Sequence, residues 1–159
     1  FNSVTNIVDL MNGYLSDVWT YPLTVKPCHI ENGQLSYSFP FEYGHDDKHV
    51  DDVSEGSDAQ TQIFNIVFRL AAYRALNLNG YPLLLDEPGA GFDEQHRAVF
   101  IDFIKTLVEE GEFSQLFLVS HYSDVHSRLN RATFLVVDPE GITLPLVYNE
   151  NVKIKYREV

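Results

Sequence analysis

The chain has 159 residues and a hydrophobic fraction of 45%, so we expect a single globular domain or lobe with one sizeable core. Its 23 acidic and 11 basic residues give a formal net charge of −12, which opposes nonspecific binding to a polyanion such as DNA. A single cysteine, Cys28, excludes an internal disulfide, and no apolar run is long enough to span a membrane, so we expect a cytoplasmic protein.

The first predicted element is a helix over residues 1–20. The spacing of its apolar residues is either that of a core-facing helix or that of the heptads of a coiled coil. Because the chain begins with Phe1 rather than Met, we expect it to be a piece of a longer protein. The apolar residues recur at alternating intervals of three and four and are Phe1, Val4, Val8, Met11, Leu15 and Val18.

Residues 23–52 are predicted to form a hairpin followed by an acidic loop. The Asn-Gly pair at 32–33 is typical of a two-residue hairpin turn, because both residues tolerate positive φ. The hairpin is expected over residues 30–43, and Pro40 predicts that its second strand lies at a sheet edge. The His and Asp residues at 45–52 have no fixed ligand spacing, so we expect a solvated loop there rather than a metal site.

Helices and short apolar strands alternate in the next part of the chain, which predicts an α/β fold. A helix over residues 57–76 precedes a strand that ends at Asp86, and a helix over 93–110 precedes a strand at 116–119. Strand, helix and strand at this spacing predict parallel pairing with a right-handed crossover. Residues 123–159 are expected to hold a short helix at 124–129 and strands at 134–137, 142–147 and 152–156, the first two joined by a turn at 138–141.

Two adjacent carboxylates, Asp86 and Glu87, close the apolar run at 81–85. At the end of a parallel strand the first carboxylate can hold Mg²⁺, while the second can orient and deprotonate the water that attacks a γ-phosphate. The plainer alternative is a strand that ends in two solvated acids, so the neighbouring segments decide between the two interpretations.

Three further segments occur in a fixed order around these carboxylates. The segment VSEGS at 53–57 opens the first helix, where unpaired N–H groups favour an anion, although Ser54 could simply cap that helix. The segment GAGFD at 89–93 follows, with Asp93 placed to cap the second helix. His121 comes directly after the second strand and its Ser120, where an imidazole can donate a hydrogen bond to a phosphate or its attacking water.

This order resembles the C-terminal half of an ABC-type ATPase head, over residues 53–122. The resemblance is closest to the SMC and SbcC-like ATPases of chromosome maintenance and DNA double-strand-break repair, including their bacteriophage relatives among recombination endonuclease subunits. The family signature is Leu-Ser-Gly-Gly-Gln/Glu, and residues 53–57 keep its serine and its second glycine while changing the other three positions. The resemblance implies that Ser54 and Gly56 contact the γ-phosphate of ATP held by the opposite subunit, Asp86 binds Mg²⁺, Glu87 is the catalytic glutamate, Asp93 belongs to the D-loop at the dimer interface, and His121 is the switch histidine.

One motif of such a head does not occur in the sequence, which contains no Gly-x-x-x-x-Gly-Lys-Ser/Thr loop to hold the β- and γ-phosphates. In the resembled proteins this Walker A half lies beyond a long coiled coil and folds against the C-terminal half. We therefore expect residues 1–159 to form one C-terminal lobe of a split head, with residues 1–20 returning from a coiled coil. Completed by its Walker A half, the lobe would bind and hydrolyse ATP with Mg²⁺ in a head-to-head homodimer. The resemblance further implies a nuclease subunit, and DNA bound by other regions.

Other functions fit the same sequence. A catalytically silent dimerisation module would bind nucleotide with its partner half but show no turnover that depends on Glu87. An SMC-type structural ATPase would entrap DNA without an associated nuclease. A transport ATPase would carry Walker A in the same compact chain, and a plain α/β domain would carry these motifs by coincidence.

Overall fold

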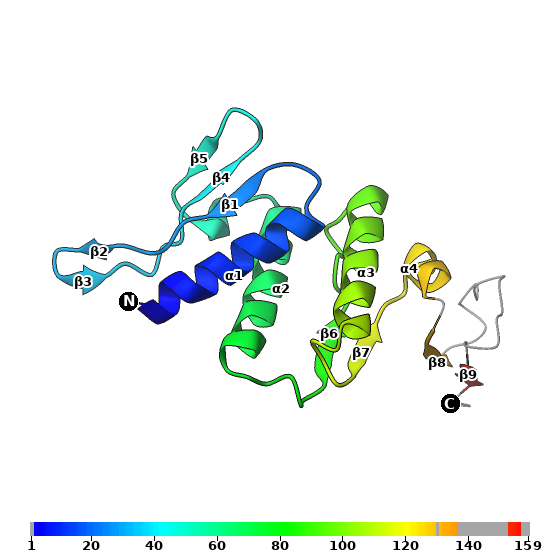
Figure 1. The fold of residues 1–159 in the computed structure, drawn as a ribbon. Coiled ribbons are helices and arrows are strands. Elements are labelled where there is room, and N and C mark those ends of the chain that lie inside the picture. Colours follow the sequence, from blue (N-terminus) through cyan, green and yellow to red (C-terminus); the bar gives the residue numbers. More distant parts are fainter. Residues whose placement is uncertain (1, 130, 137–152, 157–159) are drawn as a thin grey trace.

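The computed structural model describes residues 2–129, 131–136 and 153–156, and Figure 1 shows how their helices and strands are arranged. The helices are α1 (Asn2–Val18), α2 (Asp58–Ala75), α3 (Glu94–Glu109), α4 (Ser123–Arg128) and the 3₁₀ helix η1 (Val53–Glu55). The strands are β1 (Leu23–Val25), β2 (Ile30–Glu31), β3 (Gln34–Leu35), β4 (Phe41–Tyr43), β5 (Lys48–Val50), β6 (Leu83–Asp86), β7 (Leu116–Val119), β8 (Thr133–Val136) and β9 (Lys153–Tyr156).

Helix α1 confirms the helix predicted at the N-terminal end of the chain. Its apolar face is buried and packs on α2 and β1, as the core-facing interpretation of its spacing requires. The core continues into α2 and α3, whose inward faces come from the same three-and-four spacing. The fully buried side chains of these helices include Leu15, Val18, Ile63, Leu70 and Phe100.

A small antiparallel sheet in the order β1-β4-β5 covers part of this core. The predicted edge position of the strand after Pro40 is wrong, because β4 lies in the centre of the sheet between β1 and β5. Pro40 lies directly before β4, and its carbonyl accepts a hydrogen bond from the Lys26 N–H at 2.7 Å. The proline therefore needs no ladder donor, and the strand that follows it can pair on both sides.

The predicted hairpin is present but shorter than expected, since β2 and β3 pair only as Ile30↔Leu35 and Glu31↔Gln34. Its turn is confirmed, with φ of 51° at Asn32 and 78° at Gly33. The acidic segment that follows is a tight turn leading into β5 rather than a loop throughout. Within the described ranges, no group of three or more His, Cys, Asp or Glu side chains could hold a metal ion.

Strands β6 and β7 form the predicted parallel pair, with α3 as the connection between them. Asp93 caps α3 by accepting a hydrogen bond from the His96 N–H at 2.8 Å, and Gly111, with φ of 78°, follows the end of the helix. The Glu87 N–H donates to the Val119 carbonyl at 2.9 Å, so the pairing continues one residue past β6. The carboxyl ends of both strands therefore lie at the same edge of the sheet.

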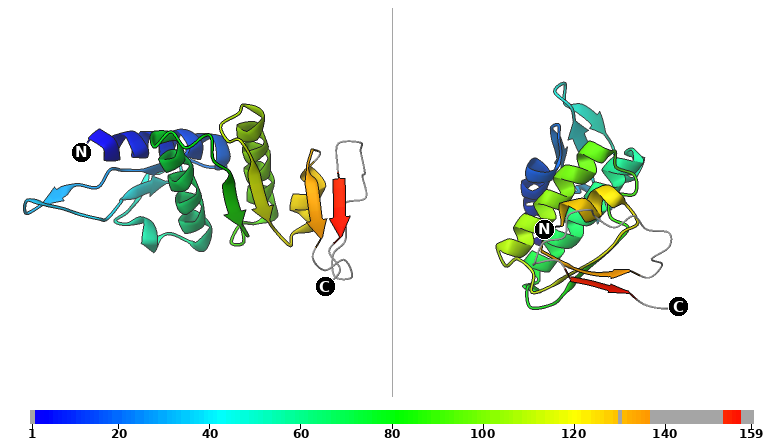
Figure 2. Two further views of the ribbon diagram at one scale, coloured as in Figure 1. Left: turned by 90° about the horizontal axis from the view of Figure 1, so that it is seen from below. Right: turned by 90° about the vertical axis from the view of Figure 1, so that its right-hand side faces the viewer.

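The two faces of the β6–β7 pair differ in their environment. Leu83 and Leu85 are buried, and Figure 2 shows the helices gathered on one side of these strands. On the other face Leu84, Phe117 and Val119 are 61%, 49% and 51% exposed. These three residues are called the bare sheet face below, since the described helices leave them uncovered.

The C-terminal part contains α4, as predicted, and then β8 and β9, which pair in parallel. The strand predicted at 142–147 and the turn predicted at 138–141 lie outside the described residues. Among the described helices, none has both the length and the apolar character needed to cross a membrane.

Candidate active site

The candidate site is built around Glu87 and His121, which lie at the carboxyl ends of β6 and β7. The Nδ1 atom of His121 is 2.8 Å from Oε1 of Glu87, so the two predicted catalytic side chains are in direct contact. Parallel pairing explains this contact, because it brings the residues that follow the two strands to the same sheet edge. The strand ends thus supply a carboxylate and an imidazole as one hydrogen-bonded pair.

The backbone of Glu87 is held in an unusual conformation. Its φ is 44°, in the left-handed region that residues with a side chain rarely adopt. The bond from its N–H to the Val119 carbonyl and the bond that its carboxylate accepts from His121 hold this conformation in place. Its second carboxylate oxygen, Oε2, is buried and has no hydrogen-bond partner among the described residues. Strain and an unpaired buried oxygen at one residue are typical of functional sites.

Asp86 is the last residue of β6, and its side chain is exposed. Since side chains alternate along a strand, Asp86 and Leu84 lie on the bare sheet face while Leu83 and Leu85 point into the core. A single exposed carboxylate suits Mg²⁺, which keeps several waters and takes one or two protein carboxylates together with substrate phosphates. Asp86 could therefore serve as a metal ligand when phosphate oxygens complete the coordination.

The signature-like segment, residues 53–57, differs in detail from the prediction. It forms the 3₁₀ helix η1, and α2 starts only after it, capped by Ser57 through reciprocal bonds with Gln60. Ser54 does not cap α2, and its N–H instead donates to Oδ1 of Asp52 at 2.9 Å. Hydrogen bonding by Ser54 lowers the pKa of Asp52 below its ordinary value despite the opposing effect of burial.

Gly56 lies where a larger residue would not fit easily. A Cβ at this position would come within 3.2 Å of the Gln60 Cβ and 3.3 Å of the Val53 carbonyl oxygen. The Thr61 hydroxyl donates to that same carbonyl at 3.3 Å and so fastens η1 to the first turn of α2. The contacts described for this part of the chain do not join Ser54 or Gly56 to Glu87 or His121.

The D-loop-like segment, residues 89–93, packs directly against the start of α2. The Gly91 N–H donates to Oε1 of Gln62 at 3.2 Å, and a Cβ at Gly91 would come within 3.4 Å of the Ala59 nitrogen. Gly89 has φ of 83°, and a Cβ there would lie 2.9 Å from the Phe92 ring. The segment thus requires glycine at position 89 and fits closely at position 91, and it contacts the start of α2.

Asp93 has the predicted capping role and an additional partner. Its Oδ1 also lies 2.9 Å from Nδ1 of His96, whose Nε2 lies 2.8 Å from the Thr20 hydroxyl. The hydrogen bonds from the backbone and ring of His96 lower the pKa of the Asp93 carboxyl below its ordinary value. The D-loop-like segment is therefore tied to the end of α1 as well as to α2.

Sequence reasoning missed four residues that surround the site. Gln62 and Arg97 contact the D-loop-like segment, Tyr122 stacks on His121, and Nε2 of His126 lies 2.8 Å from the Ser120 carbonyl oxygen. No motif or spacing in the sequence points to them, apart from the position of Tyr122 next to His121. His96, which no motif singles out, is mostly covered by neighbouring side chains.

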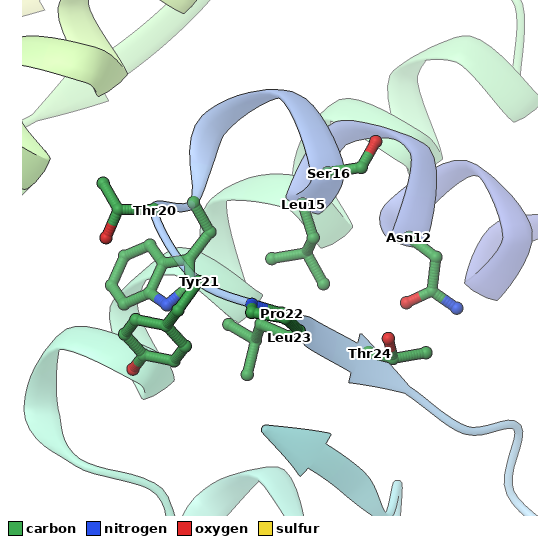
Figure 3. A pocket seen from close by; sticks show the side chains of 9 residues that line it. Asn12, Leu15, Ser16, Thr20, Tyr21, Pro22, Leu23 and Thr24 are labelled. Atoms are coloured by element: carbon green, nitrogen blue, oxygen red, sulfur yellow. The ribbon is translucent and has the colours of Figure 1, made fainter. Parts of the chain in front are cut away.

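A pocket of about 360 Å³ lies at the junction of α1 and β1, and Figure 3 shows its lining. Its lining residues are Asn12, Leu15, Ser16, Trp19, Thr20, Tyr21, Pro22, Leu23 and Thr24. None of the predicted site residues lines it, and Glu87 and His121 lie at the sheet edge instead. We therefore assign the candidate site from the strand ends and not from this pocket.

Comparison with solved structures identifies a similar fold in SMC ATPases. One similar structure comes from a study of the ATP-driven dimerization and DNA-stimulated activation of SMC ATPases. Its TM-score is 0.63 at 14% sequence identity, and the match covers 82% of this chain and 76% of that chain. The other is the SMC head domain from Thermotoga maritima, with a TM-score of 0.50 at 14% identity over 78% of this chain and 40% of that chain. No protein-family model and no curated protein sequence matches the chain. The α/β fold is therefore that of SMC ATPase heads, which confirms the predicted fold class.

Proposed function

We propose that this chain is the C-terminal lobe of a split ATPase head, which hydrolyses ATP once a separate Walker A half completes it. The observation that carries the proposal is the contact between Glu87 and His121 at the ends of two parallel strands. The similar fold of SMC ATPase heads supports it, as does the order of the motifs along the chain.

In this function Glu87 accepts a proton from the attacking water while His121 orients the γ-phosphate or that water. The strained backbone of Glu87 and its buried, unpaired Oε2 support the role, since they fix a carboxylate that still has acceptor capacity. Asp86 would hold Mg²⁺ through its exposed carboxylate. The metal, when bound, neutralises negative charge on the β- and γ-phosphates.

The Walker A half would pack on the bare sheet face. Parallel sheets are usually covered on both faces. The parallel pair β6–β7 instead exposes an apolar strip on one face, made of Leu84, Phe117 and Val119. Asp86 lies on the same face, so a partner that covers the strip would also approach the proposed metal ligand. The exposure of these three apolar side chains supports a partner with an apolar surface that would cover them.

The signature-like and D-loop-like segments would face a second head in an ATP-dependent homodimer. Both segments contact the start of α2, since the Thr61 hydroxyl bonds the Val53 carbonyl and the Gly91 N–H bonds Gln62, so one partner surface could meet both. Ser54 and Gly56 would contact the γ-phosphate held by that second head, and Asp93 would shape the interface. The similar solved structure from work on ATP-driven dimerization of SMC ATPases supports this arrangement.

The biological work we propose is DNA repair, recombination or end processing in the cytoplasm, with DNA bound by other regions of the full protein. The net charge of −12 supports that placement of the DNA contacts. A nuclease subunit at a coiled coil that continues α1 belongs to the same proposal. An SMC-type ATPase that entraps DNA without a nuclease would use the same lobe.

One observation favours a second candidate, the catalytically silent dimerisation module. Ser54 lies in the separate 3₁₀ helix η1 and not at the N-terminus of α2, where unpaired helix N–H groups would add to a phosphate contact. A signature-like segment with three altered positions and a serine away from that helix end could bind nucleotide too weakly to support turnover.

The test is DNA-stimulated ATP hydrolysis by the complete protein, or by this chain mixed with its Walker A half, with and without Glu87→Gln. We expect turnover in the wild type, loss of turnover in the variant, and ATP-dependent dimers in both. The matched control is Glu94→Gln, an exposed glutamate in the first turn of α3. ATP binding without any turnover in the wild type would favour the silent module instead.

A further inference from the structure

Arg97 lies in the first turn of α3 and contacts three segments near the candidate site. Its Nε donates to Oδ2 of Asp124 at 2.9 Å, and its Nη1 donates to the Phe92 carbonyl at 2.6 Å. Its guanidinium carbon lies 4.3 Å from the centre of the Tyr122 ring. The side chain is only 15% exposed, so water competes little for these contacts.

The Tyr122 ring, which Arg97 contacts, lies in turn against the imidazole of His121. The two rings stack with centroids 4.1 Å apart and an angle of 32° between their planes. The Tyr122 hydroxyl also lies 3.4 Å from the Ala90 carbonyl oxygen, in the D-loop-like segment. A continuous series of contacts therefore runs from Arg97 through Tyr122 and His121 to Glu87.

We propose that Arg97 is a positioning residue for the ATPase reaction: it fixes the Tyr122 ring and thereby holds the His121 imidazole against Glu87. The inference rests on the proposed function of the Glu87–His121 pair and adds a residue that no motif assigns. His121 is exposed, so it needs a fixed neighbour to keep one ring orientation. The bond from Arg97 to the Phe92 carbonyl also holds the D-loop-like segment in position.

The chemistry of arginine explains why this residue type is used. A planar guanidinium can donate through Nε and Nη1 at once while its face lies on an aromatic ring, and a lysine ammonium cannot. Burial alone would raise the pKa of Asp124, but the hydrogen bond and charge of Arg97 outweigh it, so the pKa lies below its ordinary value. Asp124 is therefore ionised at neutral pH and anchors the arginine.

The first test observes His121 directly and needs no turnover. Long-range ¹H–¹⁵N spectra of this chain with ¹⁵N-labelled histidine report which imidazole nitrogen carries the proton. For Arg97→Lys we expect the His121 nitrogens to shift towards free-imidazole values, while the exposed His29 and His45 stay unchanged. Arg69→Lys, in an exposed arginine of α2, is the matched control and should leave His121 as in the wild type.

The second test uses the completed head. We expect Arg97→Lys to lower kcat by about ten- to hundredfold with little change in KM for ATP, because geometry is lost while binding remains. Tyr122→Leu removes the ring but keeps the ion pair, and should lower kcat similarly; the double variant should be no worse than either single variant. Tyr122→Leu also decides the question should Arg97→Lys fail to fold.

Two results separate this inference from the proposed function. If the completed wild-type head never hydrolyses ATP, the proposed function fails, and the imidazole spectra alone then decide the role of Arg97. If Arg97→Lys and Tyr122→Leu leave both the His121 spectra and kcat at the level of Arg69→Lys, Arg97 is an ordinary structural arginine and the inference is wrong.

Discussion

The indole of Trp19 and the imidazole of His96 lie against each other, with ring centroids 4.3 Å apart and 38° between their planes. Trp19 follows the last residue of α1, whereas His96 lies in the first turn of α3 and bonds both Thr20 and Asp93. One imidazole thus joins the end of α1 to the cap of α3. A displacement of α1 would disturb the bonds that hold Asp93, which gives the D-loop-like segment a mechanical connection to the N-terminal helix.

Replacement of His96 by alanine removes its ring contacts with Trp19, Tyr21 and Phe92 and two side-chain hydrogen bonds. We expect a loss of about 1–3 kcal/mol in the free energy of unfolding, since such contacts contribute about 0.5–1.5 kcal/mol each. Trp19 is the only tryptophan, so its fluorescence during urea unfolding measures the change at the contact itself. His96→Phe keeps an aromatic ring at this position and should lose less; equal losses in the two variants would show that the ring contacts contribute nothing.

The fold could be predicted where its signals are local. The helices α1, α2 and α3 follow from apolar spacing and from cap residues such as Asp93 and Gly111. The strands β6 and β7 follow from short apolar runs around α3. The place of β4 could not be predicted in this way, because the pairing partners of a strand are set by contacts distant in sequence.

In the candidate site, too, only some of the residues could be predicted from the sequence. Glu87 and His121 could be placed together because parallel strands bring their carboxyl ends to one edge. Arg97 bonds Asp124 and Gln62 bonds Gly91, which are 27 and 29 residues away in the sequence, so no spacing in the sequence points to these contacts. The place of Ser54 in η1 depends on the capping bonds between Ser57 and Gln60, which start α2 only at Asp58 and which the motif alone does not determine.

Gly89→Ala tests whether the loop after Glu87 needs a positive φ. The native φ is 83°, and a Cβ would lie 2.9 Å from the Phe92 ring and 3.2 Å from the Arg97 Cγ. We expect a loss of about 1–3 kcal/mol in the free energy of unfolding, measured by urea denaturation. The loss comes from a strained backbone and from a displaced aromatic ring together.

Gly13→Ala is the opposite case and serves as the control. Gly13 lies inside α1 in an exposed position, and a Cβ there would meet nothing within 4 Å. Alanine should therefore stabilise the chain by about 0.5–1 kcal/mol through its better helix propensity. A neutral or stabilising result for Gly89→Ala would contradict the loop geometry.

Asp52→Asn tests the ionised carboxylate that holds the signature-like segment. Hydrogen bonds from Ser54 and Phe39 lower the pKa of Asp52 in the folded state. A depressed folded pKa adds stability above the unfolded value of about 4, and this stability is lost as the pH falls through the folded pKa. The wild type should be more stable than the variant near neutral pH, and the gap should close in acid. Urea unfolding between neutral and acidic pH measures this gap, with Asp46→Asn, at an exposed position in the turn before β5, as the matched control.

Phe117→Ser tests the bare sheet face as the docking surface of the Walker A half. Phe117 is half-exposed and pairs with Leu84 across the two strands, so the polar side chain should change the stability of this chain by less than about 1 kcal/mol. Binding to the Walker A half should weaken by about 10- to 100-fold, because a buried aromatic anchor would be lost from the centre of the interface. Isothermal titration of one half with the other measures both affinity and stoichiometry.

Tyr37→Ser is the matched control and should bind as the wild type does. Tyr37 is 85% exposed and lies beyond the β2–β3 hairpin. Equal affinity for Phe117→Ser and Tyr37→Ser would mean that the Walker A half covers a different surface, and the apolar strip would then need another partner.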